Sequence, residues 1–439
     1  MPNSKIFCNA PWYELHIYWD GSLGFCCQES HKMYPDRQSS IYNIKNITIR
    51  EWFDSEPMRQ ARQSMFGDKK NSFCSRCYAE ESVSDTSRRH RSNQKSVLFT
   101  RTQFKESYEQ SPGYNKFEYS KANNGAYNGM PIDLHIDLGN YCNLTCKMCT
   151  PRASSGIAVQ HVKWGIESAR QYVGTDWTRD QAVWDKTVTE IAEIKNLKNV
   201  HFMGGETLLT KRFEDFVDSM LAVGRTDLNF SFVTNGTVFN QSLLDKLLQF
   251  NKVGIEVSIE TTTDHNAYQR QGTDTAEVLK NIQRYRQYCD NDRITLTVRP
   301  AISLLTIGNY YTLLEYCLKH GLIVKSLICD HPKYYHPSIL PQEIKSQYRA
   351  RYEQFLIDHD LADVDCSIDY NESDPNQLPR IIKNQVLQCI NILDTVQPAD
   401  ANQLLGEMVK WSRRWDQVHG YDARLLYPEF KDIFDHYEY

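Results

Sequence analysis

The sequence contains no apolar run that approaches the roughly 18 residues of a membrane-spanning helix. Its first five residues lead into no signal-peptide core. An excess of positive charge is also missing: the net charge is −5, so no overall field favours nucleic acid as a partner. No repeat of fixed period is present. These absences predict a cytoplasmic protein without a membrane partner, and 439 residues, 41% of them apolar, suffice for two or three domains.

Cysteine, by contrast, is frequent and clustered. Thirteen cysteines, several in closely spaced groups, would indicate disulfides in a small secreted protein, but they indicate metal ligands in a large intracellular one. Some cysteines are isolated in the sequence, and we expect them to be buried small apolar residues: Cys289, Cys317, Cys329, Cys366 and Cys389. The rest fall into two groups, each of which predicts a metal site.

One group has the spacing C-x-x-x-C-x-x-C and consists of Cys142, Cys146 and Cys149, directly after the strand-like run 132–138. Three thiols in a short loop can bind three irons of a four-iron cluster, which leaves the fourth iron without a protein ligand. Structural zinc usually takes four protein ligands, and this loop supplies three. The spacing therefore favours an iron–sulfur cluster with one open iron.

A loop of this spacing after a strand resembles the signature of the radical S-adenosylmethionine (SAM) enzymes. The resemblance implies that SAM chelates the open iron, that an electron from the cluster cleaves SAM, and that a 5′-deoxyadenosyl radical takes a hydrogen atom from the substrate. It also implies a low-potential electron donor such as a flavodoxin or ferredoxin. The alternative is three structural cysteines that share this spacing by chance, which the further motifs argue against.

Strand-like runs alternate with helical segments through residues 131–335. The runs are residues 132–138, 199–204, 228–234, 253–260, 293–302 and 324–329. This alternation predicts an α/β fold with parallel strands, and six units match the partial (β/α)6 TIM-like barrel of the family. The polar alternate residues should point into the barrel: Asp133, His135, Asp137, Glu256, Ser258, Glu260, Thr297 and Arg299. For His135 alone, a structural hydrogen bond is favoured over catalysis.

Further motifs lie at the expected C-terminal ends of these strands, where parallel barrels carry their sites. The run Met203-Gly204-Gly205-Glu206 is similar to the Gly-Gly-Glu motif of the family, which implies that Gly204, Gly205 and Glu206 bind the SAM amino group. The resemblance also implies other SAM contacts: Asn235 and Ser258 with the ribose and carboxylate, Arg270 with the carboxylate, and Met148 with the adenine. The alternative for Arg270 is an ordinary surface arginine.

The second cysteine group lies in residues 1–82, with the spacing C-x12-G-x4-C, a gap and then C-x2-C. The residues around Asp20-Gly21 predict a β-hairpin. The pattern resembles the auxiliary-cluster motif of the twitch and SPASM domains found in many radical SAM enzymes. That resemblance implies a small N-terminal α+β domain with a second 4Fe–4S cluster held by four cysteines: Cys8, Cys26, Cys74 and Cys77.

Two features depart from that family pattern. The domain precedes the barrel, whereas such domains usually follow it, and the further cysteines of a full SPASM domain are missing after Cys77. We therefore expect one auxiliary cluster. Cys27 is the alternative to Cys26 as its ligand, and a four-cysteine zinc site is the alternative to the cluster.

The remaining segments carry less information. Residues 83–130 predict a helix followed by an irregular linker, and residues 336–439 predict a helical C-terminal region. We expect Trp411 and Trp415 to pack at the seam between these helices and the barrel, with a substrate groove as the alternative. The linker carries basic residues that predict a solvated helix face, with an RNA-binding rim as the alternative: Arg88, Arg89, Arg91, Lys95, Arg101 and Lys105.

Taken together, the motifs predict a radical SAM enzyme of the oxidoreductase or peptide-modifying type, whose auxiliary cluster transfers electrons. We expect a peptide or protein substrate. The alternatives are oxidation of a small molecule, modification of RNA, or a non-catalytic iron–sulfur electron carrier or assembly protein. The Gly-Gly-Glu motif would have no use in such a carrier. The substrate, the general acid or base and the oligomeric state are not encoded in any motif.

Overall fold

The computed structural model describes residues 3–28, 41–83, 87–97, 108–174, 176–291, 293–366 and 374–438. The chain divides into two compact units. The first consists of Met1–Tyr141, Gln171–Ser231 and Ser242–Val253, and the second of Cys142–Arg170, Phe232–Gln241 and Gly254–Tyr439. The domain boundaries expected from the sequence stay predictions.

A sheet of eight strands has the order β2-β1-β3-β4-β5-β6-β7-β9, and β8 pairs with β10. The hairpin β1-β2 is antiparallel, whereas β1-β3, β3-β4, β7-β9 and β8-β10 pair in parallel. The predicted α/β class with a partial parallel barrel is confirmed, and each expected run contains a strand. The strands are β1 Glu14–Ile17, β2 Leu23–Gly24, β3 Asp133–Asp137, β4 Asn199–Met203, β5 Asn229–Thr234, β6 Lys252–Val257, β7 Ile294–Val298, β8 Ala301–Ile302, β9 Ile323–Val324 and β10 Leu327–Ile328.

The N-terminal hairpin is part of the same sheet as the barrel strands. Its turn contains Gly21, whose φ of +85° suits a residue without a side chain. The other edge of β1 pairs in parallel with β3, so that Leu15 lies opposite Leu134. The predicted hairpin is present, and it also extends the parallel sheet, which the cysteine spacing alone could not indicate.

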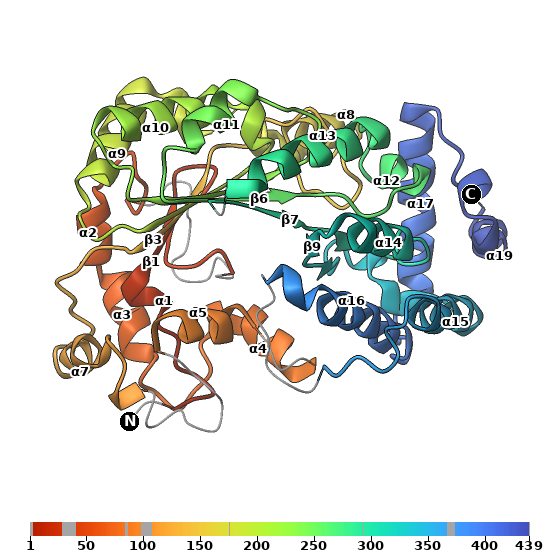
Figure 1. Ribbon diagram of the computed structural model, residues 1–439, viewed down its shortest axis with the longest axis horizontal. Helices are drawn as coiled ribbons and strands as arrows, with labels where there is room; N and C mark the ends of the chain where they lie inside the picture. Colours follow the sequence, from red (N-terminus) through yellow and green to blue (C-terminus); the bar gives the residue numbers. More distant parts are fainter. Residues whose placement is uncertain are drawn as a thin grey trace. The chain divides into compact units, whose positions relative to one another are not determined.

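Helices of the first unit flank its strands on two sides. Helices α9 and α10 lie on one side, and α3 and α5 on the other (Figure 1). Thr48 and Glu51 form a capping box at the start of α2. Residues 83–130 were expected to form a helix followed by an irregular linker; α5 agrees with the expected helix, and α7 lies in the part expected to be irregular. The bounds are α1 Ala10–Tyr13, α2 Ile49–Phe53, α3 Glu56–Ser64, α4 Ser75–Val83, α5 Arg88–Val97, α7 Tyr114–Ala122, α9 Gln181–Glu193 and α10 Lys211–Ala222.

The core of the first unit is aromatic. Phe202 of β4 packs against Phe213 and Phe216 of α10, with ring centroids 4.9 and 5.0 Å away. The polar side chains of β3 alternate with buried apolar ones, since Leu134 and Ile136 are buried while Asp133 is half-buried. This alternation agrees with the prediction that polar positions leave the packed face of the sheet.

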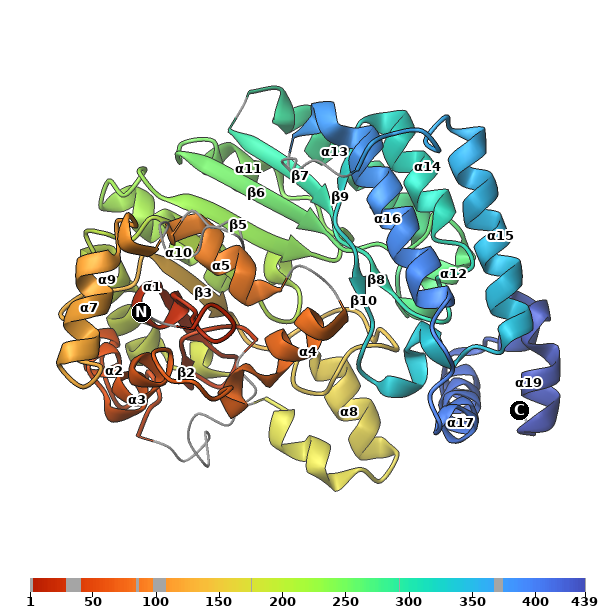
Figure 2. The same ribbon diagram turned by 90° about the horizontal axis from the view of Figure 1, so that it is seen from below.

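The second unit is mainly helical, and α14, α15 and α16 lie side by side in it (Figure 2). Trp411 and the buried Trp415 of α17 pack against Trp164, which supports the predicted seam. Among the described residues, no helix has the length and apolar composition needed to cross a membrane. The bounds are α8 Ser155–Lys163, α11 Gln241–Leu247, α12 Asp264–Gln269, α13 Thr275–Gln287, α14 Tyr311–His320, α15 Gln342–Asp358, α16 Leu378–Leu393, α17 Ala401–His419, α18 Ala423–Leu426 and α19 Lys431–His436.

Two candidate iron–sulfur sites

The Gly-Gly-Glu run follows β4 and packs against the chain that leads into the three-cysteine loop. Gly204 and Gly205 both have positive φ, +97° and +49°. A Cβ on Gly204 would lie 2.4 Å from the carbonyl oxygen of Gly139, and one on Gly205 would lie 2.0 Å from that of Tyr141. The Glu206 backbone N–H donates to the same Tyr141 carbonyl at 2.7 Å. Glycine is therefore required at both positions by conformation and by space.

Glu206 is buried, with 1% of its surface exposed. Its Oε1 accepts a hydrogen bond from the backbone N–H of Leu208 at 3.0 Å and so caps a short helical turn, Thr207–Leu209. The carboxylate is held in place by this cap at the end of the glycine run. A fixed, buried carboxylate is suited to accept hydrogen bonds from an ammonium group.

In the second unit, the three-cysteine loop is attached to the segment that follows α12. The backbone N–H of Thr145 donates to the carbonyl of Gln271 at 3.0 Å, and that of Lys147 donates to the carbonyl of Gln269 at 2.8 Å. These two bonds hold the backbone between the first and third cysteines against the segment that follows α12.

The thiols of the loop affect one another electrostatically. Burial, together with a smaller effect of the neighbouring Cys142, raises the pKa of the Cys149 thiol to about 12. Burial also raises the pKa of Cys146, against the opposing charge of Arg270, and both other cysteines add to the increase. Thiols that raise one another's pKa lie close together and release their protons most readily to a shared cation.

Arg270 lies beside these thiols and is 8% exposed, so the alternative of a surface arginine is wrong. Its Nε and Nη2 donate to the two carboxylate oxygens of Glu260 at 2.6 and 2.7 Å. Its Nη1 points to Cys146 Sγ at 4.0 Å. Burial lowers the pKa of Arg270, but Glu260 and Cys146 raise it by more. The guanidinium therefore stays charged next to the cysteine loop.

Asn235 also reaches the loop. Its Nδ2 donates to Asn143 Oδ1 at 2.9 Å and lies 3.9 Å from Cys142 Sγ. Ser258 follows β6, and its backbone N–H donates to the carbonyl of Thr234 at 2.9 Å. Met148, between the second and third cysteines, is half-buried. The structure thus brings Asn235 and Arg270 to the thiols, while the SAM contacts expected of all these residues stay predictions.

Lys147 is a residue of the loop that the sequence did not single out. It is 3% exposed, with its Nζ 3.3 Å from Asp416 Oδ1 and 3.8 Å from the centre of the Tyr268 ring. Burial lowers its pKa to about 8, against the opposing effect of Asp416. This lysine anchors the loop to α17. In the sequence, the only sign of a role for Lys147 is its position between two cysteines, because its partner Asp416 lies far away in the chain.

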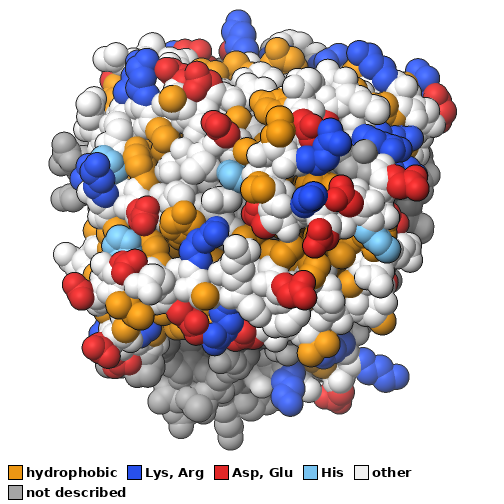
Figure 3. Space-filling view, turned by 90° about the vertical axis from the view of Figure 1, so that its right-hand side faces the viewer, with side chains coloured by type: hydrophobic (Ala, Val, Ile, Leu, Met, Phe, Trp, Pro, Cys, Tyr) orange, Lys and Arg blue, Asp and Glu red, His pale blue; other side chains and the backbone are white. Residues whose placement is uncertain are grey.

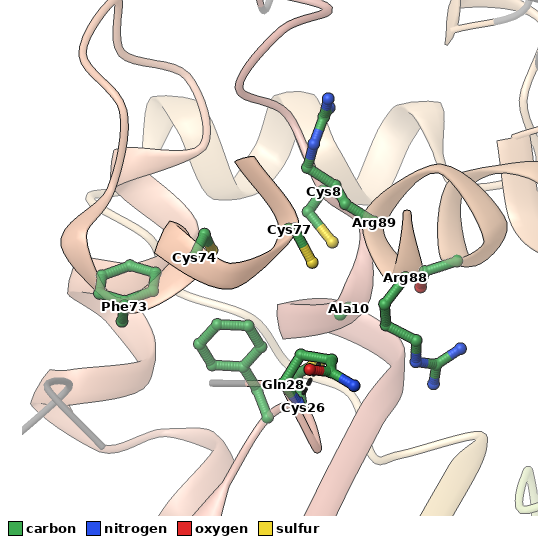
Figure 4. Close-up of a pocket in the computed structure, with 11 residues that line it drawn as sticks. Cys8, Ala10, Cys26, Gln28, Phe73, Cys74, Cys77, Arg88 and Arg89 are labelled. Carbon is green, nitrogen blue, oxygen red and sulfur yellow. Dashed lines mark hydrogen bonds between the residues drawn. The ribbon is translucent and has the colours of Figure 1, made fainter. Parts of the chain in front are cut away.

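The four N-terminal cysteines line one pocket in the first unit (Figure 4). Cys8 precedes α1, Cys26 follows β2, and Cys74 and Cys77 lie where the short turn Ser72–Cys74 meets α4. Burial raises the pKa of Cys8 to about 12, with a further contribution from Cys77, and raises that of Cys77 to about 11. Cys27 is not among the residues that line the pocket.

Both donor sets fit clusters better than a single zinc ion. Sulfur ligands of tetrahedral zinc, bound at about 2.3 Å, lie about 3.8 Å apart. Among the described residues, the one set of three Cys, His, Asp or Glu ligand atoms within 4.8 Å of one another contains no cysteine. Among the described residues, neither cysteine group therefore has its sulfurs as close together as one zinc ion requires.

Two basic residues of α5, Arg88 and Arg89, do not lie on the solvated face that the sequence predicted. Arg88 pairs with Glu14 at 2.7 Å, and Arg89, which is 2% exposed, pairs with Glu81 at 2.7 Å. Both arginines line the four-cysteine pocket. Burial is favoured here because each cation has a carboxylate partner. Arg91 is exposed; Arg101, Lys105 and the side chain of Lys95 lie outside the described residues.

Comparison with known protein families gives two matches, one to each segment that contains a cysteine group. Residues 136–301 match the radical SAM superfamily, and residues 8–78 match an iron–sulfur cluster-binding domain, SPASM. No curated protein matches the sequence.

Among solved structures, the chain is similar to anSMEcpe with bound AdoMet at 17% identity and TM-score 0.39, over 53% of this chain and 62% of that one. It is also similar to SuiB of Streptococcus suis bound to S-adenosylmethionine at 11% identity and TM-score 0.33, over 59% and 57%. The chain thus spans less than two thirds of the length of each of these proteins. The chain thus contains a radical SAM domain and a SPASM-type iron–sulfur domain, and these two domains imply a radical 4Fe–4S cluster, an auxiliary cluster and SAM as cofactors.

Proposed function

We propose that this enzyme reductively cleaves SAM and removes a hydrogen atom from a peptide or protein side chain, with its auxiliary cluster serving electron transfer. The observation that carries the proposal is the three-cysteine loop, in which three mutually interacting thiols lie beside a charged arginine on a backbone that is already fixed. The peptide class follows from what the resemblance implies.

Cys142, Cys146 and Cys149 are the proposed ligands of the radical cluster. The Arg270 guanidinium near Cys146 favours the thiolate form, and the Asn235 amide near Cys142 fixes one side of the loop. When bound, the cluster and SAM supply a 5′-deoxyadenosyl radical. We assign Gly204, Gly205 and Glu206 to the SAM amino group, Asn235 and Ser258 to its ribose and carboxylate, Arg270 to its carboxylate, and Met148 to its adenine.

Cys8, Cys26, Cys74 and Cys77 are the proposed ligands of the auxiliary cluster, and their shared pocket supports Cys26 over Cys27. Four cysteines would occupy all four irons, so no iron would be open to a substrate. Electron transfer is therefore the role that this ligand set favours. A flavodoxin or ferredoxin remains the proposed donor.

Modification of RNA has less support. An RNA-binding rim needs uncompensated Lys and Arg, but Arg88 and Arg89 are neutralised by Glu14 and Glu81. On the face that carries α15, α17 and α19, basic and acidic side chains are interspersed (Figure 3). A non-catalytic carrier is disfavoured by the glycine run, whose tight packing such a protein would not need.

The test is the release of 5′-deoxyadenosine from SAM by the full chain, reconstituted anaerobically and reduced with dithionite. We expect the wild-type protein to release it and Cys146→Ala to release none. Cys366→Ala is the control, because Cys366 is an isolated, half-buried thiol outside both groups. Release by Cys146→Ala at the wild-type rate would refute the assignment of the radical cluster.

A further inference from the structure

Three histidines form a row across neighbouring strands of the first unit. The parallel pairing of β1, β3 and β4 places His16 opposite His135 and His135 opposite His201. The ring centroids are 4.2 Å apart in the first pair and 4.6 Å apart in the second. Asp137 lies two residues after His135, so its carboxylate is on the same face of β3. The register therefore gathers three imidazoles and one carboxylate on one side of the sheet.

Three of these groups converge on one point. His16 Nε2 lies 3.1 Å from Asp137 Oδ1, and His135 Nε2 lies 3.7 Å from the same oxygen. One ligand atom from each residue falls within 4.8 Å of the other two. Nitrogen and oxygen ligands bound to a tetrahedral ion at about 2.1 Å lie about 3.4 Å apart. The observed separations bracket this value.

The groups are enclosed, and part of their hydrogen-bonding capacity is unused. The side chains of His16, His135 and Asp137 are 5%, 16% and 12% exposed. His135 Nε2, which faces the Asp137 oxygen, is buried and has no hydrogen-bond partner among the described residues. The Tyr18 ring stacks on His16 with centroids 3.9 Å apart and fixes the plane of the imidazole. Asp137 Oδ1 already forms a hydrogen bond with His16 Nε2, whereas the buried His135 nitrogen has no such bond, and a cation held by all three groups would satisfy it.

We propose that His16, His135 and Asp137 bind one divalent first-row transition-metal ion, with ligands that belong to neither cysteine group. Two imidazoles and a carboxylate suit ions such as Zn²⁺ or Fe²⁺ rather than Mg²⁺ or Ca²⁺, which take oxygen ligands. Three protein ligands leave a coordination position for a ligand from solution. This proposal does not depend on SAM cleavage or on the substrate.

His201 lies outside this site although it completes the row. Its Nδ1 is within 2.7 Å of Ser231 Oγ, which is a hydrogen bond that fixes the ring. It contacts His135 through the ring edge, and it is not one of the three convergent ligands. His201 therefore supplies a control in which an imidazole is removed next to the site but not from it.

Co²⁺ is the probe, added to the full-length protein after anaerobic reconstitution, when iron occupies the cysteine sites. We expect about one Co²⁺ per chain, d–d absorption without the intense thiolate charge-transfer band, and displacement by Zn²⁺. His135→Gln and Asp137→Asn should each weaken binding by more than about tenfold. His201→Gln should bind as the wild type does. Iron content and the thermal midpoint of each variant check that it folds.

The proposal is overturned if the wild-type protein binds no Co²⁺ in this way, if the bound ion shows thiolate charge transfer, or if both ligand variants bind as tightly as the wild type. If a variant fails to fold, X-ray absorption at the Co edge of the wild-type protein decides the matter. Two imidazole nitrogens and oxygen bound to the Co²⁺ ion would support the proposed site, and sulfur bound to it would refute the proposal.

Discussion

The two cysteine sites are assembled in different ways. The three-cysteine loop is one short stretch of chain, residues 142–149, fixed by backbone hydrogen bonds and flanked by a buried ion pair. The four-cysteine pocket draws its thiols from three places, the segment before α1, the residues after β2 and the start of α4, and α5 contributes two paired arginines to its lining. The positions of the three loop thiols therefore depend on local hydrogen bonds and on the neighbouring ion pair. The positions of the four pocket thiols depend on how distant segments of the first unit pack together. Each site should be removable without the other.

The largest expected effect separates the clusters themselves. Cys77→Ala should lower the iron content of the reconstituted protein from about eight to about four per chain, because the pocket loses a ligand while the loop keeps its three. Release of 5′-deoxyadenosine should continue, and substrate turnover should stop. Iron analysis with electron paramagnetic resonance is the measurement, with Cys366→Ala as the control. An unchanged iron content in Cys77→Ala would contradict the assignment of the pocket.

The next effect concerns the ion pair beside the loop. Glu260→Gln leaves the buried Arg270 without its carboxylate, and removing one partner of a buried pair costs about 3–5 kcal/mol. The matched control is Glu256→Gln, since the Glu256–Arg299 pair at 3.1 Å has side chains 27% and 29% exposed. We expect that control to cost less than about 1 kcal/mol. Urea unfolding of both variants measures the difference, and equal losses would show that the buried pair has no special role.

The features that could be predicted from the sequence are those formed by residues close together in the chain. The strands of the barrel, the Asp20-Gly21 turn and the three-cysteine loop each depend on neighbouring residues, so their spacing is visible directly. The Arg270–Glu260 pair was not predicted, although both residues had been singled out, because two positions ten residues apart need the turn between β6 and α12 to bring them together. Arg88 and Arg89 were misjudged for a similar reason, since their carboxylate partners lie elsewhere in the chain.

The row formed by His16, His135 and His201 shows most clearly what the sequence could not predict. His135 was recognised as a polar strand residue, but His16 and His201 belong to strands whose register with β3 only the structure provides. The hairpin was expected to be separate from the barrel sheet, and so His16 could not have been placed beside His135. A shift of one residue in that pairing would move the side chain to the other face.

A smaller effect tests whether the glycine run supports the loop through packing. Gly205→Ala places a Cβ against the carbonyl oxygen of Tyr141, the residue before Cys142, in addition to the strain of a positive φ. Gly224→Ala is the control, because Gly224 has φ of +75° and open space around it, so it should lose only the conformational cost of about 1–2 kcal/mol. Gly205→Ala should lose more and should also bind SAM more weakly. Equal stability losses with normal SAM binding would argue against the packing role.

The smallest expected effect concerns the arginines of the pocket. Arg88 and Glu14 neutralise each other at 2.7 Å, so Arg88→Gln leaves a negative carboxylate close to the proposed auxiliary cluster. Added negative charge disfavours reduction, and we expect the potential of that cluster to fall by on the order of tens of millivolts. The double variant Arg88→Gln with Glu14→Gln should recover most of this change, because the pair is then removed as a unit. Redox titration followed by electron paramagnetic resonance resolves the two clusters, and the potential of the radical cluster should not move. A shift in both clusters, or none in either, would mean that α5 does not set the charge around the pocket.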